Sequence, residues 1–133
     1  MQMLETDWWT IELPPEWEAE QDDEVVVIED EDGVSCIEIS SLVREDGVVS
    51  DADLAGFSLD LREEGHTSRP VSVGAWRGEL FVHDDAEHHW REWFLRQGGH
   101  FVYIAYHCLL EHKHMDDAAV DEILATLEPR NAA

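Results

Sequence analysis

The sequence predicts an α+β fold in which an antiparallel sheet of about six to seven strands is flanked by two main helices, in the order β-β-β-α-β-β-β-β-α. Short segments of alternating or continuous apolar residues recur along the chain, as in strands. Most of them are joined by short polar turns, which favour antiparallel pairing. Two other segments repeat apolar residues at helical spacing, as helices that cover a sheet do. The 133 residues are close to the commonest domain size, so we expect residues 1–133 to form a single domain.

The N-terminal third contains three of the predicted strands. They occupy residues 9–13, 25–28 and 34–42. The first alternates apolar and polar side chains, whereas the second is apolar on both faces and indicates an interior strand. Between these two, we interpret the acidic stretch 16–24 as a connection with Trp17 as its apolar anchor. The Asp32-Gly33 pair predicts a hairpin turn between the second and third strands.

Two helices and four more strands make up the rest of the chain. Ser50 is a favourable N-cap for a helix over residues 51–64, and Gly65 can adopt the left-handed conformation that ends it. The four strands are predicted at residues 71–73, 76–83, 88–96 and 101–110. A final helix begins near Asp116, and its apolar residues follow helical spacing. They are Val120, Ile123, Leu124 and Leu127, with Pro129 at the end.

This order of elements resembles the PsbP-like fold, an antiparallel sheet flanked by helices. The matching features are Ile11-Glu12-Leu13-Pro14 followed by Trp17, the strand 25–28, the Asp32-Gly33 hairpin, the helix 51–64 and the closing helix. The family includes photosystem II extrinsic proteins, a Ran-binding import factor and small bacterial proteins, some of which act as chaperones or adaptors in secretion. The resemblance implies the fold, and it assigns no functional residue to this chain.

The charge of the chain restricts its partners. It has 32 Asp and Glu against 8 Lys and Arg, a formal net charge of -24, and Lys113 is its single lysine. Nucleic acids bind through cationic side chains, so this surface would repel nucleic acids and anionic membranes. A basic protein, a cationic peptide or a cation remains compatible with it. Alternatively, the acidic residues serve only to keep the protein soluble, as in adaptation to a salt-rich cytoplasm.

The N-terminus and the cysteines favour a cytoplasmic location. Residues 1–7 have neither the basic nor the apolar region of a secretory signal. No apolar run approaches the roughly 20 residues of a membrane-spanning helix. Cys36 and Cys108 are far apart in the sequence, each in an apolar stretch, and we expect them to be reduced core residues.

Two histidine-rich segments are candidates for metal binding. The segment His112-Lys113-His114-Met115-Asp116-Asp117 resembles the HxHxDH motif of metallo-β-lactamase-type hydrolases. It would make the protein a small metal-dependent hydrolase using His112, His114 and Asp116. That fold needs a longer chain and further downstream histidines, so we favour a polar connection in which Asp116 caps the last helix. The segment 83–89 carries three histidines and three acids, and we favour a solvated turn there.

No other motif predicts catalysis or a cofactor. The acidic turn 29–33 lacks ligands at the positions that an EF-hand requires. His107 lies in an apolar strand, and Cys108 beside it must point to the opposite face. Glycine-rich nucleotide-binding motifs and the GxSxG motif are absent from the sequence. We therefore expect no cofactor.

Six tryptophans in a small domain suggest a binding surface. Trp8 and Trp9 are adjacent, so in a strand they must face opposite sides. Exposed tryptophan and arginine are enriched at binding hot spots. The candidate binding residues are Trp8, Trp76, Trp90, Trp93, Arg91 and Arg96. Alternatively, both faces of the sheet are covered and all six tryptophans belong to the core.

The sequence therefore favours a non-catalytic, chaperone-like or adaptor domain that binds a protein or peptide, possibly a basic one, through an acidic surface with an aromatic patch. Two alternatives stay open. One is the metal-dependent hydrolase described above. The other is an immunity-type protein whose acidic surface neutralises a basic toxin.

Overall fold

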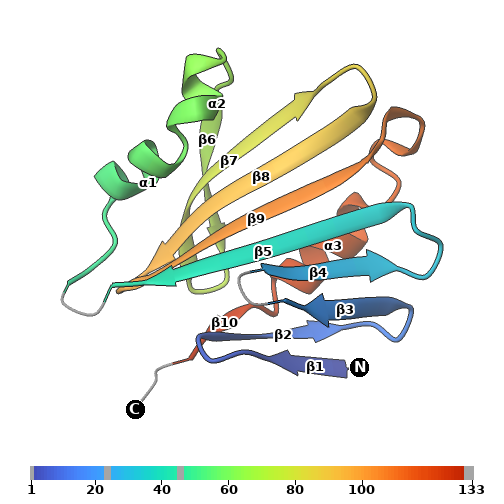
Figure 1. The fold of residues 1–133 in the computed structure, drawn as a ribbon, viewed down its shortest axis with the longest axis horizontal. Coiled ribbons are helices and arrows are strands. Elements are labelled where there is room, and N and C mark those ends of the chain that lie inside the picture. Colours follow the sequence, from blue (N-terminus) through green and yellow to red (C-terminus); the bar gives the residue numbers. More distant parts are fainter. Residues whose placement is uncertain (1, 23–24, 45–46, 131–133) are drawn as a thin grey trace.

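The computed structural model describes residues 2–22, 25–44 and 47–130, and it has the predicted α+β architecture (Figure 1). Most strands form a seven-stranded antiparallel sheet in the order β3-β4-β5-β9-β8-β7-β6. They are β3 (Trp17–Gln21), β4 (Val25–Asp30), β5 (Ser35–Val43), β6 (Ser68–Val73), β7 (Trp76–Asp84), β8 (His88–Gln97) and β9 (His100–Leu109). A smaller antiparallel sheet has the order β1-β2-β10. Its strands are β1 (Gln2–Glu5), β2 (Trp9–Leu13) and β10 (Glu128–Pro129).

The predicted strands are all present, but the acidic stretch 16–24 was interpreted wrongly as a connection. Its residues Trp17–Gln21 form β3, which pairs with β4 at one edge of the large sheet, and residues 23 and 24 lie outside the described part. Only Trp17 of this strand is fully buried. Acidic side chains on an edge strand also discourage pairing with another chain. The pattern of apolar residues did not predict this strand, because most of its side chains are polar and exposed.

The helices are α1 (Asp51–Phe57), α2 (Leu59–Glu63), the short 3₁₀ helix η1 (Leu110–His112) and α3 (Asp117–Leu124). The predicted helix 51–64 is thus divided at Ser58. The Ser58 hydroxyl donates to the Leu54 carbonyl at 2.9 Å, and such a local bond competes with the regular helical pattern. None of the helices in the described part of the chain has the length and apolar character that crossing a bilayer would need.

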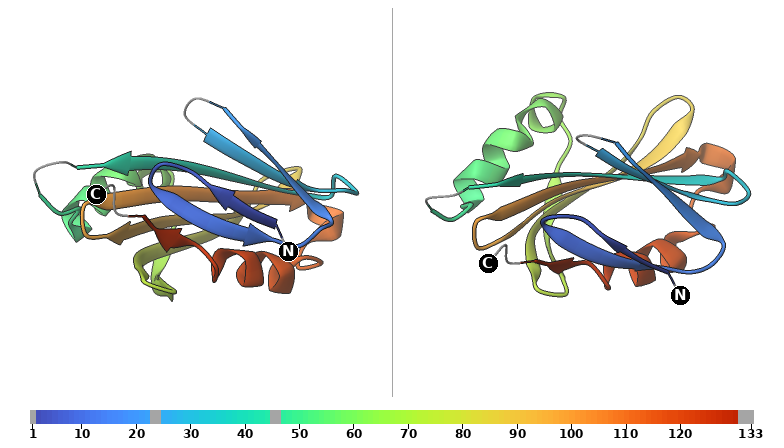
Figure 2. Two further views of the ribbon diagram at one scale, coloured as in Figure 1. Left: turned by 90° about the horizontal axis from the view of Figure 1, so that it is seen from below. Right: turned by 60° about the horizontal axis from the view of Figure 1, so that its bottom comes forward.

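One face of the large sheet carries the main core. The small sheet and α3 lie on this face, as Figure 2 shows. Ile104 and Leu95 from the large sheet, Ile11 from β2 and Ile123 from α3 are all buried there. We refer to this side as the core face.

The opposite face, which we call the open face, is covered only at one end. Leu54 of α1 packs there with Phe81, Phe94 and Phe101 in a second, smaller cluster. Figure 2 shows that α1 and α2 lie over this end of the sheet. No helix of the described residues covers the rest of the open face, which carries half-buried polar and aromatic side chains.

Candidate functional site

Strand alternation separates the six predicted binding residues. Trp90 is on the open face, whereas Trp93 and Arg91 are on the core face. Trp93 and Trp76 are only 3% and 0% exposed. The Trp76 indole donates to the Leu127 carbonyl at 3.1 Å, so it anchors β7 to the C-terminal segment. The structure therefore does not bring the four predicted tryptophans together in one exposed patch, because Trp76 and Trp93 are core residues.

The other predicted residues have local partners. Trp8 is half-buried, packs against the main core and lies 6.3 Å from His100, measured between ring centroids. Arg91 donates to Asp121 at 2.7 Å and stacks over Trp93. The Arg96 side chain lies on the other side of β8, where it donates to Asp51 at 2.9 Å. The two arginines therefore tie α3 and α1 to opposite faces of the sheet.

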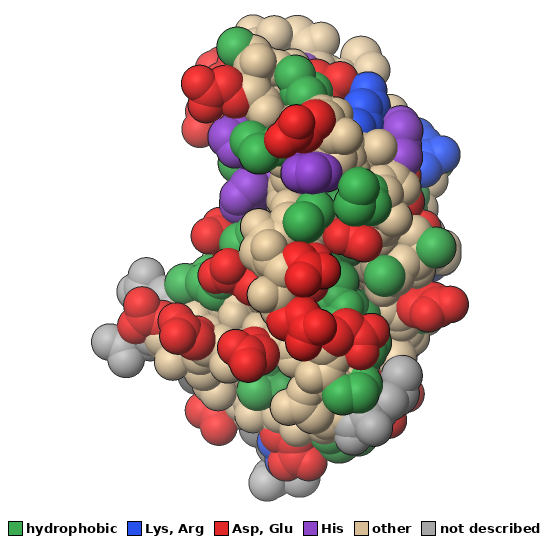
Figure 3. All heavy atoms as spheres, turned by 90° about the vertical axis from the view of Figure 1, so that its right-hand side faces the viewer, with side chains coloured by type: hydrophobic (Ala, Val, Ile, Leu, Met, Phe, Trp, Pro, Cys, Tyr) green, Lys and Arg blue, Asp and Glu red, His purple; other side chains and the backbone are tan. Residues whose placement is uncertain are grey.

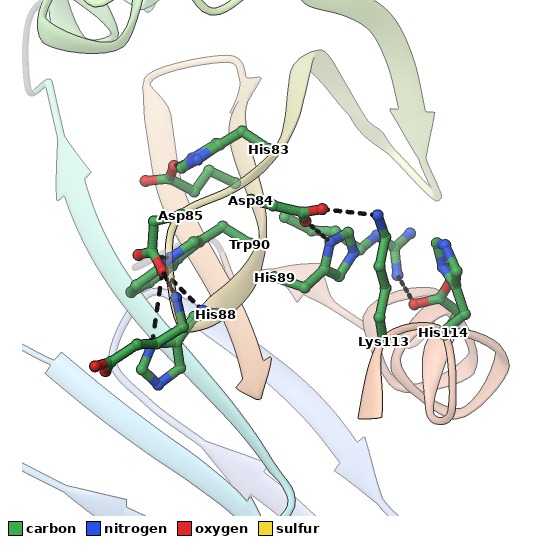
Figure 4. A network of polar contacts seen from close by, with 12 residues as sticks. His83, Asp84, Asp85, His88, His89, Trp90, Lys113 and His114 are labelled. Carbon is green, nitrogen blue, oxygen red and sulfur yellow. Dashed lines mark hydrogen bonds and ion pairs between the residues drawn. The ribbon is translucent and has the colours of Figure 1, made fainter. Parts of the chain in front are cut away.

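Trp90 is half-buried on the open face, so part of its ring is accessible. Its ring lies nearly parallel to that of His83 at 6.3 Å, and the His107 ring is 4.8 Å away. The Trp90 indole donates to Asp85 at 2.8 Å. This bond fixes the ring across the open face, beside the β7–β8 turn (Figure 4).

Asp85 organises that turn. Its carboxylate accepts the backbone N–H groups of Glu87 and His88 at 2.8 and 2.7 Å. The Glu87 amide, the Trp90 indole and the His88 amide together lower the pKa of Asp85 to about 2. The segment 83–89 is therefore an ordered hairpin turn with an ionised carboxylate at its centre.

A groove runs between the α1–α2 pair and the open face. One part has a volume of about 390 Å³, and an adjoining part of about 340 Å³ shares three lining residues with it. The first part is lined by Phe57, Asp60, Leu61, Glu64, Glu92, Phe94, Phe101 and Tyr103. The second part adds His66, His83, Asp84, Asp85 and Trp90. We call the two parts together the helix groove; its walls are aromatic and aliphatic, and its charged groups are acidic.

Glu92 lies at the junction of the two parts. It is only 8% exposed, and it accepts hydrogen bonds from the Tyr103 hydroxyl and from His83 Nε2, the latter at 2.5 Å. The His66 ring stacks on His83 with 4.2 Å between centroids. Burial, and then the bond to Glu92, raise the pKa of Tyr103 far above its ordinary value. Sequence analysis missed Glu92, although a carboxylate between the aromatic residues of one strand face was a usable signal.

A Cys–His pair lies further along the open face, and it is poorly suited to catalysis. Cys36 on β5 is the cross-strand partner of His107 on β9, while Cys108 is buried on the core face as expected. Burial, and then the charges of Glu38 and Glu29, raise the pKa of the Cys36 thiol to about 11. Burial also lowers the pKa of His107. The thiol is therefore protonated at neutral pH and a weak nucleophile.

The predicted metal ligands do not converge as proposed. His112 lies 3.5 Å from Glu111, and Asp116 accepts the Ser35 hydroxyl at 2.6 Å and makes no side-chain cap for α3. Among the described residues, one group of three potential ligands converges, namely His89, His114 and Asp117. Of the proposed ligand set His112, His114 and Asp116, this group contains His114 alone. The histidine that joins His114 is His89, the second residue of β8, and it belongs to the other candidate segment, 83–89.

The surface agrees with the composition. Figure 3 shows acidic side chains spread across the face in view, with histidines gathered in its upper half near the few basic side chains. Most of the basic residues are engaged in ion pairs, such as Arg44 with Asp53 at 2.8 Å and Lys113 with Asp84 at 2.8 Å. The bond from Lys113, and then the one from His89, lower the pKa of Asp84.

Comparison with known proteins bears on the fold. No family model matches the chain, and no curated protein sequence matches it. A crystal structure of a Bacteroides thetaiotaomicron VPI-5482 protein is similar, with a TM-score of 0.69, 16% identity and 94% of this chain covered. This chain spans 46% of that protein's length. The solution structure of cyanobacterial PsbP (CyanoP) from Synechocystis sp. PCC 6803 has a TM-score of 0.66 at 10% identity, and the match covers 97% of this chain and 92% of that one. The chain therefore has a PsbP-like fold.

Proposed function

We propose that the protein is a non-catalytic, chaperone-like or adaptor domain that binds a basic, partly apolar peptide segment of a partner protein in the helix groove. The observation that carries this proposal is the combination of apolar walls and acidic groups in one groove. None of the described residues that line it is Lys or Arg. A peptide with apolar and cationic side chains is the complementary ligand.

The exposed apolar residues beside the groove support peptide binding. Phe57 and Leu59 are 45% and 50% exposed although they belong to the two helices that border the groove. Covering a half-exposed phenylalanine contributes about 1 kcal/mol to binding. The net charge of -24 would attract a basic partner at long range and raise its association rate at low salt.

The chemistry of the open face favours binding over catalysis. Tyr103 and Cys36 both have raised pKa values, so neither is ionised at neutral pH. Glu92 is occupied by two hydrogen bonds within the protein. A toxin with a basic, partly apolar segment would be one such partner protein, so an immunity-type role is a special case of the same proposal.

A cytoplasmic location belongs to the same proposal. Both cysteines are free thiols, and their side chains lie on opposite faces of the sheet. Such a pair cannot form a disulfide without a change of the backbone. An oxidising compartment would offer this protein no stabilising crosslink within the chain.

The binding proposal is tested with two labelled peptides that share length and apolar residues but differ in charge. One carries Lys and Arg, and the other has Gln at those positions. We expect fluorescence anisotropy to show that the basic peptide binds and that its affinity falls as salt rises. Phe57→Ser should weaken binding about tenfold, which corresponds to about 1.4 kcal/mol.

Leu42→Ser is the matched control, because Leu42 is 47% exposed and lies on β5 outside the lining of the groove. It should leave the affinity for the basic peptide unchanged. Equal binding of the two peptides, or equal losses in the Phe57 and Leu42 variants, would contradict the proposal.

A further inference from the structure

We propose that His89, His114 and Asp117 form a binding site for one divalent transition-metal ion of the zinc class. One ligand atom from each residue lies within 4.8 Å of the others. His89 comes from β8 and His114 from the segment before α3 (Figure 4). Asp117 is the first residue of α3. The site is on the core face of the sheet, whereas the helix groove is on the open face. None of the three ligands lines the helix groove, so the inference does not rest on the proposed function, although Asp84 lines the groove and also contacts His89.

The strongest indication is the state of His89. Its side chain is 0% exposed, and Nε2 is buried without a hydrogen-bond partner among the described residues. A buried polar nitrogen without a partner destabilises the folded protein. A metal ion is a partner that would remove this cost.

The second ring nitrogen of His89 has the contact that metal-binding histidines usually have. Nδ1 lies 2.6 Å from Asp84 Oδ1, and a carboxylate oxygen accepts, so Nδ1 donates. Donation at Nδ1 leaves the lone pair of a neutral ring on Nε2. A carboxylate that holds the other N–H of a ligand histidine fixes the orientation of the ring and increases its basicity. Lys113 in turn holds the other oxygen of Asp84 at 2.8 Å.

His114 and Asp117 provide the accessible side of the site. The His114 side chain is 64% exposed, and its Nδ1 lies 2.7 Å from Asp117 Oδ2. A metal ion would replace the proton that the two atoms now share. Asp117 Oδ1 is buried without a hydrogen-bond partner among the described residues, and it is 3.7 Å from the nearest nitrogen of Arg91. An ion could therefore enter from solvent past His114 and contact His89 at the buried end.

The donor set determines the class of ion. Two imidazole nitrogens and one carboxylate oxygen suit zinc and its neighbours, with water as a fourth ligand, and they suit calcium or magnesium poorly. Arg91 and Lys113 place positive charge close to the site, which weakens binding of a dication. We therefore expect a dissociation constant in the micromolar range rather than the nanomolar range.

The test is a zinc titration of untagged, chelator-stripped protein by calorimetry, in excess Mg²⁺ to occupy the many exposed carboxylates. We expect one Zn²⁺ per chain. His114→Ala changes an exposed side chain, and it should weaken binding at least about tenfold, as should Asp117→Asn. His112→Ala is the matched control, because His112 lies two residues away outside the converging group, and it should bind like the wild type.

A spectroscopic measurement identifies the buried ligand without removing it. Long-range ¹H–¹⁵N spectra should show His89 as the Nδ1–H tautomer in the apo protein, and Zn²⁺ should shift its Nε2 resonance. The proposal is overturned if magnesium abolishes zinc binding, if His112→Ala weakens it as much as His114→Ala, or if the His89 resonances do not respond to zinc.

Discussion

At Glu92, a carboxylate occupies a position between Trp90 and Phe94 on one face of β8 where the alternation would suit another apolar residue. Two hydrogen bonds, from Tyr103 and His83, compensate the burial of its charge. A charged acceptor makes each of them stronger than a bond between neutral groups. Removing either donor would leave a buried carboxylate with fewer partners, which is costly. This arrangement couples the ionisation of Tyr103 to the stability of the fold.

The two tyrosines of the chain give a pH-dependence with a definite sign. Burial is the main cause of the raised pKa of both Tyr103 and Tyr106, and the ordinary value is about 10. The folded state thus holds these phenolic protons more tightly than the unfolded state. Their contribution to stability is complete below pH 10 and is lost as pH rises above it. We expect no tyrosinate absorbance at 295 nm in the native protein at pH 10.5, and a falling urea midpoint above pH 10.

Unfolded protein in urea is the control for this titration, and it should show both tyrosines ionising near pH 10. In the variant Tyr103→Phe, Tyr106 should be the one remaining tyrosine, and it should ionise only well above pH 10. The variant should also be less stable than the wild type at pH 7, because Glu92 loses a hydrogen-bond donor. A native tyrosine that ionises with an ordinary pKa would show that the corresponding hydroxyl is not buried as described.

At single residues, the sequence predicted which strand face a side chain occupies better than which distant side chain it contacts. Strand alternation correctly separated Cys108 from His107. It could not show that His89 would meet His114, because that contact depends on how the segment after β9 folds back to α3. Nor could it distinguish the buried Trp93 from the partly accessible Trp90, since both are tryptophans of one strand and only the covering elements differ.

Among the elements, the strands with apolar faces were predictable and those defined by distant partners were not. β8 and β9 are apolar over long stretches and form the centre of the sheet with β5. By contrast, β10 has two residues and exists because it pairs with Trp9 and Thr10 of β2. The local sequence around Glu128 and Pro129 has no pattern that predicts such a strand. The same holds for β1, which is exposed along most of its length and pairs with β2.

The approach of β7 to β8 makes Gly78 a sensitive position. A Cβ atom there would lie 1.8 Å from the carbonyl oxygen of Phe94, far inside van der Waals contact, and the obstacle is backbone. Gly78→Ala should therefore force the two strands apart and lower the free energy of unfolding by at least about 3 kcal/mol. Urea denaturation followed by tryptophan fluorescence measures this change.

Gly56→Ala is the matched substitution, because Gly56 lies in α1 and a Cβ atom there meets nothing within 4 Å. Alanine is the better helix former, so this variant should be more stable by about 0.5–1 kcal/mol. If the two variants had similar stabilities, the tight contact between β7 and β8 would be refuted.

At the scale of the whole molecule, the fold must hold together against its own charge. The 32 acidic side chains outnumber the basic ones four to one, so ion pairs can neutralise only a minority of them. The acidic side chains lie outside the two core clusters, which are apolar. Both edge strands of the large sheet carry charge or proline, with Glu18 and Glu20 on β3 and Pro70 on β6. The composition predicted this outer distribution, since unpaired carboxylates cannot be buried.

This balance predicts that salt stabilises the protein. Raising NaCl from 10 mM to 1 M shortens the screening length from about 30 Å to about 3 Å, so the repulsion among surface carboxylates is nearly removed. The few exposed ion pairs lose strength as well, but each contributes only about 0–1 kcal/mol. We expect the free energy of unfolding in urea to rise by at least about 1 kcal/mol over this range.

The combined variant Glu18→Gln, Glu63→Gln and Glu122→Gln removes three exposed charges that have no ion-pair partner among the described residues. It should be more stable than the wild type at low salt, and its stability should respond less to NaCl. If the free energy of unfolding instead fell as NaCl rose, the ion pairs would contribute more to stability than the repulsion among carboxylates removes. The prediction that charge repulsion limits the stability of this fold would then be wrong.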